Sequence, residues 1–380
     1  MNVFVCSKRK IQVMPINADD HRYMHLALQI AKKEQGKTYP NPSIGCVIVK
    51  DGKILATGHT NAGGVPHAEI MAMKNSSNLE GASMYVTMEP CCHYGKSSPC
   101  TKEIVKNKIK RVVIGMVDPN PLVSGKGIKE LRNNKIEVDI GCCESEAREQ
   151  NAGFVSRISQ GVPKVVAKIA ITKDNFMAKK NNERLKITNA EIDRYIHVLR
   201  SKYDGILIGN GTYKKDNPNL NIRLEGYNSF SSARFVLSSH ADIIENSNLY
   251  LTKNNGNLYF IVSSELSIIN SKELSLDGLR FIRVKKNDDD NFLKLDDVVE
   301  QIGKNGINNL LIEPGVTLFD NIIKKTIPDE LIFFQSKNRI GKEGLFVEAL
   351  DNIINNKNKS YEFISKKEMC DTYIIKYRTK

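Results

Sequence analysis

The sequence lacks any apolar run close to the roughly 18 residues that a membrane-spanning helix needs, although 41% of its residues are hydrophobic. A membrane span is therefore not expected. The first ten residues, MNVFVCSKRK, place a very short apolar patch before a basic cluster, whereas a secretory signal has the opposite order and a longer apolar region. Cysteine is also scarce, with eight in 380 residues and two pairs adjacent. This usage favours metal ligation or free thiols over disulfides, and we expect a cytoplasmic protein.

A concentrated charged segment is absent too, despite a net charge of +13. Residues 1–160 contain 22 basic and 15 acidic side chains, and the rest of the chain contains 34 and 28. A basic tail or arm that binds nucleic acid would gather its charge in one place. The even spread instead fits a Lys/Asn-rich composition or an anionic small-molecule substrate, so we predict no nucleic-acid or membrane partner.

A chain of 380 residues is too long for one ordinary core and predicts two domains. A helical stretch ends near Ile158 and is followed by Gly161 and Pro163, which predicts domains over residues 1–161 and 162–380. Strand-like and helix-like stretches alternate in both, as is typical of α/β domains. In the first domain we expect helices over 21–33, 68–73 and 101–107 and strands over 44–49, 53–57, 83–88, 112–117 and 136–140, with a hairpin turn at Asp51-Gly52. In the second we expect a helix over 190–201 and strands over 165–171, 205–208, 235–237, 258–262, 281–284, 310–312, 331–334 and 373–377.

One histidine and two cysteines form the most informative pattern in the sequence. His67, Cys91 and Cys100 can supply three zinc ligands and leave the fourth tetrahedral position to water. An open position is typical of catalytic zinc, which lowers the pKa of bound water to about 7. Glu69, two residues after His67, is placed to move that water's proton to a leaving amine without binding metal. The pattern predicts hydrolytic deamination of an amino group on a pyrimidine-like ring.

A closed structural zinc site, or simply buried cysteines, is the alternative interpretation of this pattern. Cys92 and His93 are additional candidate ligands that keep it open. The remaining cysteines of the first half, Cys46, Cys142 and Cys143, are expected to be packing residues.

His67-Ala68-Glu69 with the later Pro90-Cys91 resembles the cytidine and deoxycytidylate deaminase superfamily. Nucleic-acid deaminases have Pro-Cys-x-x-Cys, whereas Cys100 lies nine positions after Cys91. This long loop, with the segments 39–45 (YPNPSIG) and 118–121 (DPNP), is similar to the deaminase half of RibD, a bifunctional family of riboflavin biosynthesis. The resemblance implies a cytidine-deaminase-like three-layer domain that deaminates a diaminohydroxyphosphoribosylaminopyrimidine.

Within that family, the residues of the pattern take definite roles. The resemblance implies that His67, Cys91 and Cys100 bind zinc and that Glu69 is the catalytic proton shuttle. Asn41 would contact the base, although an Asn-Pro turn without any ligand contact explains it equally well.

The second half has neither a G-x-G-x-x-G after a strand nor a P-loop. Gly209-Asn210-Gly211-Thr212 alone is weak evidence for a phosphate-binding turn. An ordered series of motifs nevertheless resembles the reductase half of the same family, whose fold is similar to dihydrofolate reductase. The series comprises Lys168, Thr172, Asp174, Ile187-Thr188, Leu199-Arg200, Gly209 to Thr212, Asp216 to Arg223 and Glu313 to Gly315.

This second resemblance implies that NADPH reduces the ribosyl group of the deaminated product to ribityl, with Lys168 as the catalytic residue. The cofactor contacts it implies are Ile171, Lys186, Thr212, Asp216, Ser239, Gly315, Val316 and Thr317. The substrate contacts it implies, besides Asn41, are Arg184, Arg200, Leu220, Arg223 and Glu313.

The second half departs from the family at three places. The family usually has a small polar residue and a tryptophan before the Ile-Thr pair, whereas this chain has Arg184-Leu185-Lys186 and no tryptophan at all. It usually has glycine at the position of Asn175 and a small residue at the position of Pro314. These departures affect the region where the cofactor is expected, and Arg184 or Lys186 could instead meet the extra phosphate of NADPH.

Two alternative functions follow. A decayed reductase would leave a deaminase alone, and a tRNA deaminase is a more remote possibility. The bifunctional hypothesis is favoured because the charged residues of the reductase series remain, namely Lys168, Arg200, Asp216, Arg223 and Glu313. Enzymes of this class commonly self-associate, so a homodimer or higher homo-oligomer is expected.

Overall fold

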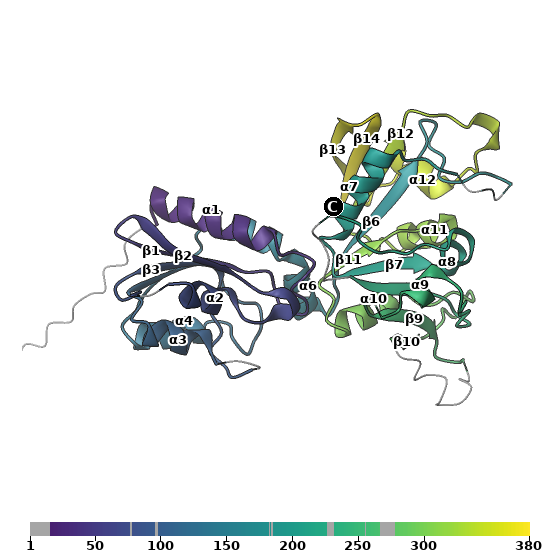
Figure 1. Cartoon of the computed structure of the whole chain (residues 1–380). Helices are drawn as coiled ribbons and strands as arrows, with labels where there is room; N and C mark the ends of the chain where they lie inside the picture. Colours follow the sequence, from purple (N-terminus) through teal and green to yellow (C-terminus); the bar gives the residue numbers. More distant parts are fainter. Residues whose placement is uncertain are drawn as a thin grey trace, which may run out of the picture. The chain divides into compact units, whose positions relative to one another are not determined.

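The computed structural model describes residues 16–76, 78–95, 98–181, 183, 185–225, 232–254, 256–266 and 278–380. The chain forms two compact units (Figure 1). The first unit contains residues 16–34, 43–61 and 65–151, and the second contains residues 35–42, 62–64 and the described part of 152–380. Within the described residues, no helix is both long enough and apolar enough to cross a bilayer.

The division between the units falls before Ala152, whereas the sequence places the domain boundary after Gly161. The difference is helix α6 (Ala152–Gln160), which packs against strand β6 (Lys164–Ile171) of the second unit. A close backbone approach holds it there, because a Cβ at Gly153 would lie 2.2 Å from the carbonyl oxygen of Asn308. Only glycine permits this contact.

The first unit is built on a sheet whose described part has five strands in the order β2-β1-β3-β4-β5. These are β1 (Gly45–Lys50), β2 (Lys53–His59), β3 (Ser83–Met88), β4 (Arg111–Met116) and β5 (Glu137–Ile140). Strand β1 is antiparallel to β2 and β3, and β3, β4 and β5 are parallel. The predicted hairpin turn is confirmed, since Asp51 and Gly52 take φ values of 49° and 73°, as a two-residue turn of this kind requires.

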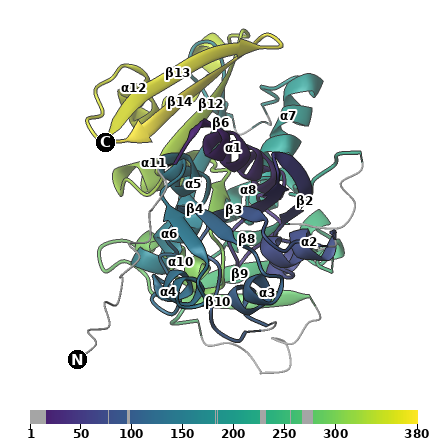
Figure 2. The same cartoon turned by 90° about the vertical axis from the view of Figure 1, so that its left-hand side faces the viewer.

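Helices cover both faces of this sheet. They are α1 (Ala18–Lys32), α2 (Ala68–Lys74), α3 (Cys100–Lys106), α4 (Lys126–Asn133) and α5 (Glu144–Gln150). A 3-10 turn, η1 (Ala62–Gly64), lies in a segment that groups with the second unit. Helices α1 and α5 contact each other and pack on β1, β3 and β4, while α2 packs on β1 and β2 and contacts α3, which contacts α4. Figures 1 and 2 both show α1 on the opposite side of the sheet from α3 and α4. The predicted three-layer arrangement is confirmed.

A buried ion cluster joins α1 to the sheet. The guanidinium of Arg111 donates to both carboxylate oxygens of Asp20, at 2.7 and 3.0 Å, and to Oδ2 of Asp139 at 2.7 Å. The hydroxyl of Tyr85 also donates to Oδ1 of Asp20, at 2.8 Å. Although burial raises it, the hydrogen bond from Arg111 holds the pKa of Asp20 below its ordinary value. The position of α1 therefore depends on buried charges that are fully paired.

The described part of the second unit forms a nine-stranded sheet in the order β10-β9-β8-β7-β11-β6-β12-β14-β13. Besides β6, its strands are β7 (Gly205–Gly209), β8 (Ala233–Leu237), β9 (Leu258–Ser263), β10 (Leu279–Val284), β11 (Asn309–Ile312), β12 (Glu330–Ser336), β13 (Tyr361–Met369) and β14 (Thr372–Thr379). Neighbours from β10 to β12 are parallel, and β14 is antiparallel to β12 and β13. Because β11 inserts between β6 and β7, the strand order reverses there, and open α/β sheets bind ligands at such a point.

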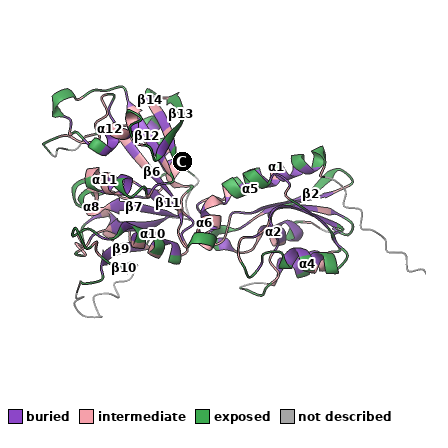
Figure 3. Cartoon of the chain, turned by 180° about the vertical axis from the view of Figure 1, so that it is seen from behind, coloured by how far each residue is buried: buried purple, intermediate pink, exposed green. Residues whose placement is uncertain are grey.

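Two apolar cores lie on the two faces of this sheet. One includes residues of α10 (Leu295–Lys304), α11 (Val316–Lys324) and α12 (Glu348–Ile354), and the other includes residues of α7 (Ala190–Arg200), α8 (Asn210–Asp216) and α9 (Asn248–Leu251). Successive side chains of a strand point to opposite faces, so Leu207 enters the first core and Ile206 and Ile208 enter the second. Figure 3 shows the buried strands in purple and the exposed outer surfaces of helices in green.

Every predicted strand and helix is present among the described residues, with small shifts of the ends. The sequence did not predict α4, α5, α8 to α12, η3 (Gly341–Glu343) or β13. Helix α8 illustrates the reason, since it begins in the glycine-containing segment after β7, and glycine disfavours helices. Tyr213, which is 1% exposed and packs against Phe260, anchors this helix through a tertiary contact instead.

Replacing the buried arginine tests the ion cluster. Arg111→Met should lower the free energy of unfolding by about 3–5 kcal/mol, because Asp20 and Asp139 would be left buried without their counter-charge. The matched control Arg148→Met removes a pair with Glu144 whose side chains are 49% and 46% exposed, and it should cost less than about 1 kcal/mol. Urea unfolding followed by circular dichroism measures both, and similar small losses would contradict the role given to the cluster.

Candidate active sites

The three predicted zinc ligands come together in the first unit. His67 is the N-cap of α2, Cys91 follows β3, and Cys100 is the first residue of α3. The Nδ1 atom of His67 lies 3.5 Å from Sγ of Cys91 and 3.4 Å from Sγ of Cys100, and all three ligand atoms lie within 4.8 Å of one another. Tetrahedral zinc, with bonds of about 2.0–2.1 Å to nitrogen and about 2.3 Å to sulfur, separates such atoms by about 3.6 Å. The donor set and its spacing therefore fit a zinc ion.

This cluster offers three protein ligands. Among the described residues, neither Cys92 nor His93 joins the group of mutually close ligand atoms around His67. A structural zinc site normally has four protein ligands, whereas a catalytic site has three and keeps one position for water. The geometry thus favours the catalytic interpretation over the closed structural one.

Hydrogen bonds within the cluster shift the pKa values of its thiols. Hydrogen bonding with Cys100 lowers the pKa of the Cys91 thiol to about 4 and raises that of Cys100 well above its ordinary value. The backbone N–H of Cys100 also donates to Sγ of Cys91, at 3.4 Å. Hydrogen bonding with Cys91 in turn raises the pKa of His67 to about 9. The hydrogen bonds thus favour the thiolate form of Cys91, which is the form that binds metal.

Glu69 lies beside the ligands without belonging to them. It is in the first turn of α2 and only 4% exposed. The thiol of Cys100 hydrogen-bonds to its carboxylate, and burial raises its pKa. A carboxyl whose pKa is raised toward neutrality is suited to taking up and returning a proton.

A second buried glutamate, Glu89, was missed by the sequence analysis. Its carboxylate accepts hydrogen bonds from the backbone N–H groups of Asp118 at 3.3 Å, Gly125 at 2.9 Å and Ile128 at 3.1 Å. It thereby joins the segment before Cys91 to the loop that leads into α4. Its one signal in the sequence is an acidic residue directly after a buried strand.

Asn41 lies in a segment that groups with the second unit. Its side-chain amide donates to the carbonyl oxygen of Gly64 at 2.8 Å. The close packing requires glycine there, because a Cβ on Gly64 would lie 2.7 Å from Nδ2 of Asn41, and the φ of Gly64 is +89°. This contact explains a structural role for Asn41, and its contact with the base stays a prediction.

The second unit contains a cavity of about 1290 Å³ at the carboxyl ends of β7, β8 and β11. Its position coincides with the reversal of strand order, where ligand sites of α/β sheets are found. Most of the predicted reductase residues line it, namely Lys168, Lys186, Arg200, Thr212, Asp216, Leu220, Ser239, Glu313, Gly315, Val316 and Thr317.

Two predicted residues do not line the cavity, and a third is not among the described residues. Ile171 is fully buried in the apolar core and, within the described part of the chain, neither it nor Arg223 lines the cavity. Arg223 donates to Oδ1 of Asn221 at 3.0 Å. Arg184 lies outside the described residues. The roles of all three in binding stay predictions.

Glu313 holds two cationic side chains at the cavity wall. It accepts two hydrogen bonds from Arg200, at 2.6 and 2.9 Å, and its Oε2 lies 3.4 Å from Nζ of Lys168. The three side chains are 12–14% exposed. Although burial raises it, the charges of Arg200 and Lys168 hold the pKa of Glu313 well below its ordinary value. The triad fixes the ammonium of Lys168 where a ligand in the cavity can meet it.

The backbone tolerates the absence of the family's usual glycine at one position and depends on a glycine at another. Asn175 has a φ of 64°, a conformation that asparagine adopts more readily than most residues, so the turn survives without glycine. A Cβ at Gly315 would lie 3.0 Å from Oγ1 of Thr212, so the lack of a side chain at Gly315 lets these two segments pack closely at the wall of the cavity.

Comparison with known proteins identifies the family of the chain. Residues 17–116 match the cytidine and deoxycytidylate deaminase zinc-binding region, and residues 163–366, more than half of the chain, match the RibD C-terminal domain. The chain belongs to the RibD family. RibD of Aquifex aeolicus is 35% identical over 87% of this chain and 90% of its own length, and RibD of Escherichia coli is 31% identical over 85% and 89%.

Solved RibD structures show the same architecture. The diaminohydroxyphosphoribosylaminopyrimidine deaminase/5-amino-6-(5-phosphoribosylamino)uracil reductase of Thermotoga maritima has a TM-score of 0.80 at 29% identity, covering 95% of this chain and 98% of its own. RibD of Acinetobacter baumannii has a TM-score of 0.82 at 27% identity, covering 95% and 99%. The predicted fold class is confirmed. This member of the RibD family is a bifunctional deaminase and reductase of riboflavin biosynthesis, with a zinc-binding deaminase region and a reductase domain of a kind that uses a nucleotide cofactor.

The Glu313 triad predicts how stability depends on pH. Because the pKa of Glu313 is lowered in the folded state, its ionised form stabilises the protein above the ordinary pKa of about 4.3, and this contribution is lost as the pH falls further. Glu313→Gln should cost about 3 kcal/mol at pH 7, and the deficit should shrink below pH 4.

Urea unfolding at a series of pH values measures this difference. The control Glu265→Gln alters a carboxylate that is 69% exposed beside Lys286 and should change stability little at any pH. A deficit for Glu313→Gln that stays constant down to pH 3 would contradict the assignment.

Proposed function

We propose that this enzyme deaminates a diaminohydroxyphosphoribosylaminopyrimidine and then reduces the ribosyl group of the product to ribityl with NADPH. The substrates follow those in the name of the Thermotoga maritima relative. The observation that carries the proposal is the three-ligand cluster of His67, Cys91 and Cys100 beside the buried carboxylate of Glu69. It is a small-molecule enzyme in this proposal, without a nucleic-acid or membrane partner, and acts in the cytoplasm as a homodimer or higher homo-oligomer.

In the deaminase, His67, Cys91 and Cys100 hold a zinc ion. Zinc bound there would supply a water molecule whose pKa is lowered to about 7. Glu69 accepts a proton from that water as the new carbon–oxygen bond forms, and returns it to the amine as the carbon–nitrogen bond breaks and ammonia leaves. The buried position of Glu69 keeps its carboxyl available for both transfers at neutral pH.

In the reductase, the Glu313 triad orients the reacting groups. NADPH bound in the cavity would supply the hydride. The cofactor is contacted by Thr212, Asp216, Ser239 and the segment from Gly315 to Thr317. The backbone N–H groups at the start of α11 suit its phosphates. Lys186, or Arg184, meets the extra phosphate. Lys168 polarises the carbon centre that is reduced, while Arg200, Leu220 and Arg223 hold the substrate.

A deaminase with an inactive reductase half remains the alternative. The arrangement of Lys168, Arg200 and Glu313 argues against it, since three charged side chains with little exposure to solvent are costly unless they are paired and used. Lys186 also lines the cavity, which supports a replacement of the usual cofactor contacts.

Removing the proton shuttle tests the deaminase. Glu69→Gln should lower the rate of ammonia release from the phosphoribosylaminopyrimidine by about 10²–10⁴-fold while the bound zinc is retained. The control Glu80→Gln alters a carboxylate that is 64% exposed and should keep full activity. Ammonia release is measured by a coupled assay and zinc by atomic emission. Full activity in the Glu69 variant would rule out the proposed role.

Removing the lysine tests the reductase independently. Lys168→Met should abolish the NADPH oxidation that follows deamination, with a loss of at least about 10²-fold, while ammonia release stays at the wild-type rate. The control Lys304→Met changes a lysine that is 56% exposed on α10. One absorbance trace of NADPH measures the effect. If the wild-type enzyme releases ammonia but oxidises no NADPH, the deaminase-only alternative is correct.

A further inference from the structure

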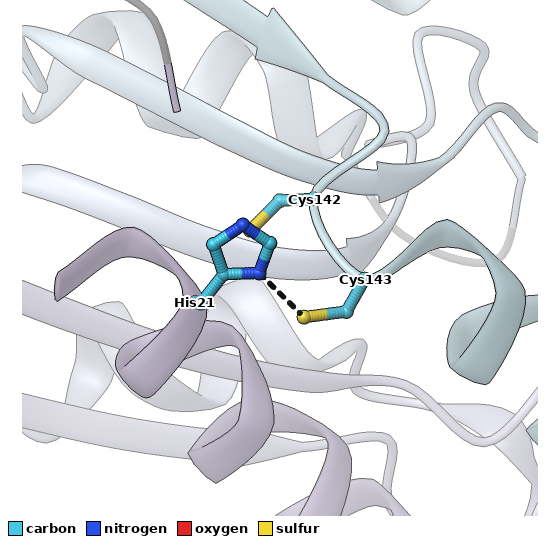
Figure 4. A group of neighbouring side chains, drawn as sticks. All are labelled: His21, Cys142 and Cys143. Carbon is cyan, nitrogen blue, oxygen red and sulfur yellow. Dashed lines mark hydrogen bonds between the residues drawn. The ribbon is translucent and has the colours of Figure 1, made fainter. Parts of the chain in front are cut away.

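A second group of metal-binding side chains lies in the first unit, on the side of the sheet that α1 and α5 cover. The Nδ1 atom of His21 lies 3.4 Å from Sγ of Cys143, and the ligand atoms of His21, Cys142 and Cys143 all lie within 4.8 Å of one another. Figure 4 shows both sulfurs beside the imidazole ring of His21. The His67 cluster lies at α2 and α3, which cover the other face.

Two more donors adjoin this group. His25 follows His21 by four residues on α1, so the two imidazoles share one face of the helix, with ring centroids 6.5 Å apart. The ligand atoms of His25, Cys143 and Glu146 also lie within 4.8 Å of one another. Cys143 thus belongs to two overlapping groups. The side chains of His25 and Glu146 are 53% and 54% exposed, and Nε2 of His25 lies 4.0 Å from Oε1 of Glu146.

The backbone directs the thiols to this place. Cys142 and Cys143 stand between β5 and α5, and α5 packs against α1. Cys143 is the N-cap of α5, yet its side chain makes no capping hydrogen bond, and its backbone is left-handed with a φ of 55°. That conformation is strained for a residue other than glycine, and it occurs where the sulfur of Cys143 contacts His21.

We propose that His21, Cys142, Cys143 and His25 form a second zinc site, which is structural and joins α1 to α5. Two thiolates and two imidazoles are the ligand set of many closed tetrahedral zinc sites. Cys142 and Cys143 are buried, as expected of packing residues, and the proposal adds a role as ligands for both. Burial raises the pKa of both thiols, that of Cys142 to about 12, so zinc binding releases protons.

Zinc at this site would act on stability and leave the chemistry of the His67 site unchanged. A ligand that binds only the folded protein stabilises it in proportion to the logarithm of its concentration. The site joins two helices that contact each other, so unfolding of the first unit would require release of the ion. The proposal does not depend on the proposed function, since it shares no residue with the His67 cluster or Glu69.

The number of zinc ions per chain tests the proposal. The full-length protein is stripped with a chelator, saturated with Zn²⁺, freed of excess metal by gel filtration and analysed by atomic emission. We expect two ions per chain for the wild type, one for Cys143→Ser and one for His21→Ala. Cys91→Ser should also retain one, because it loses the other site. The matched control Cys370→Ser removes an exposed thiol of the second unit and should retain two.

Two further measurements separate binding from misfolding. Deaminase activity should persist in His21→Ala and Cys143→Ser, which shows that both variants fold. Zinc should raise the melting temperature of Cys91→Ser but not that of the double variant Cys91→Ser/Cys143→Ser. Cobalt-loaded Cys91→Ser/Cys100→Ser should show thiolate-to-cobalt charge-transfer absorption, because the thiolates of Cys142 and Cys143 remain as ligands.

The zinc counts of the variants distinguish the presence of the second site from its absence. One ion in the wild type that is unaffected by Cys143→Ser and lost in Cys91→Ser would overturn the second site. One ion in the wild type that is lost in Cys143→Ser would support it and would instead contradict zinc binding by the His67 cluster.

Discussion

The chemistry of the first unit depends on the close approach of one imidazole and two sulfurs, at 3.4–3.5 Å, from segments far apart in the sequence. That approach requires the start of α2, the end of β3 and the start of α3 to meet at one place. Buried polar contacts hold these elements there. Glu89 ties the segment before Cys91 to the loop that leads into α4, and Arg111 ties α1 to the sheet. A zinc site of three ligands tolerates little displacement, since each bond has a fixed length.

In the second unit, ion pairs between charged side chains hold the functional groups in position. Three ionised side chains, Lys168, Arg200 and Glu313, come from β6, α7 and the end of β11 and meet at a cavity with 12–14% exposure. Removing one would leave the others buried and uncompensated, so the triad is costly to disturb. The same pairing orients the lysine that faces the cavity. Stability and positioning therefore depend on one interaction, and the insertion of β11 between β6 and β7 creates it.

The two histidine and cysteine clusters differ in what surrounds them. At His67, a buried carboxylate adjoins three ligands, and among the described residues no fourth ligand closes the set. At His21, the proposed structural site would combine two thiols with a histidine pair at helical spacing, and the adjoining carboxylate of Glu146 is exposed. An open position with a proton acceptor permits catalysis, whereas a complete set favours a structural ion. Histidine and cysteine can thus form sites with different functions in one domain.

Local sequence by itself determined most of the strands, the hairpin at Asp51-Gly52 and the roles expected of His67 and Glu69, because alternation, turn chemistry and ligand type are properties of neighbouring residues. Resemblance to a known family, and not a local pattern, indicated the reductase residues, most of which line the cavity. The tertiary structure alone decided that α6 packs with the second unit, that Glu89 braces the ligand loop, and that Cys142 and Cys143 meet His21. Each of these depends on contacts across 29 or more residues of sequence. Such contacts are set by how the sheet and its helices pack, and no local pattern of residues specifies them.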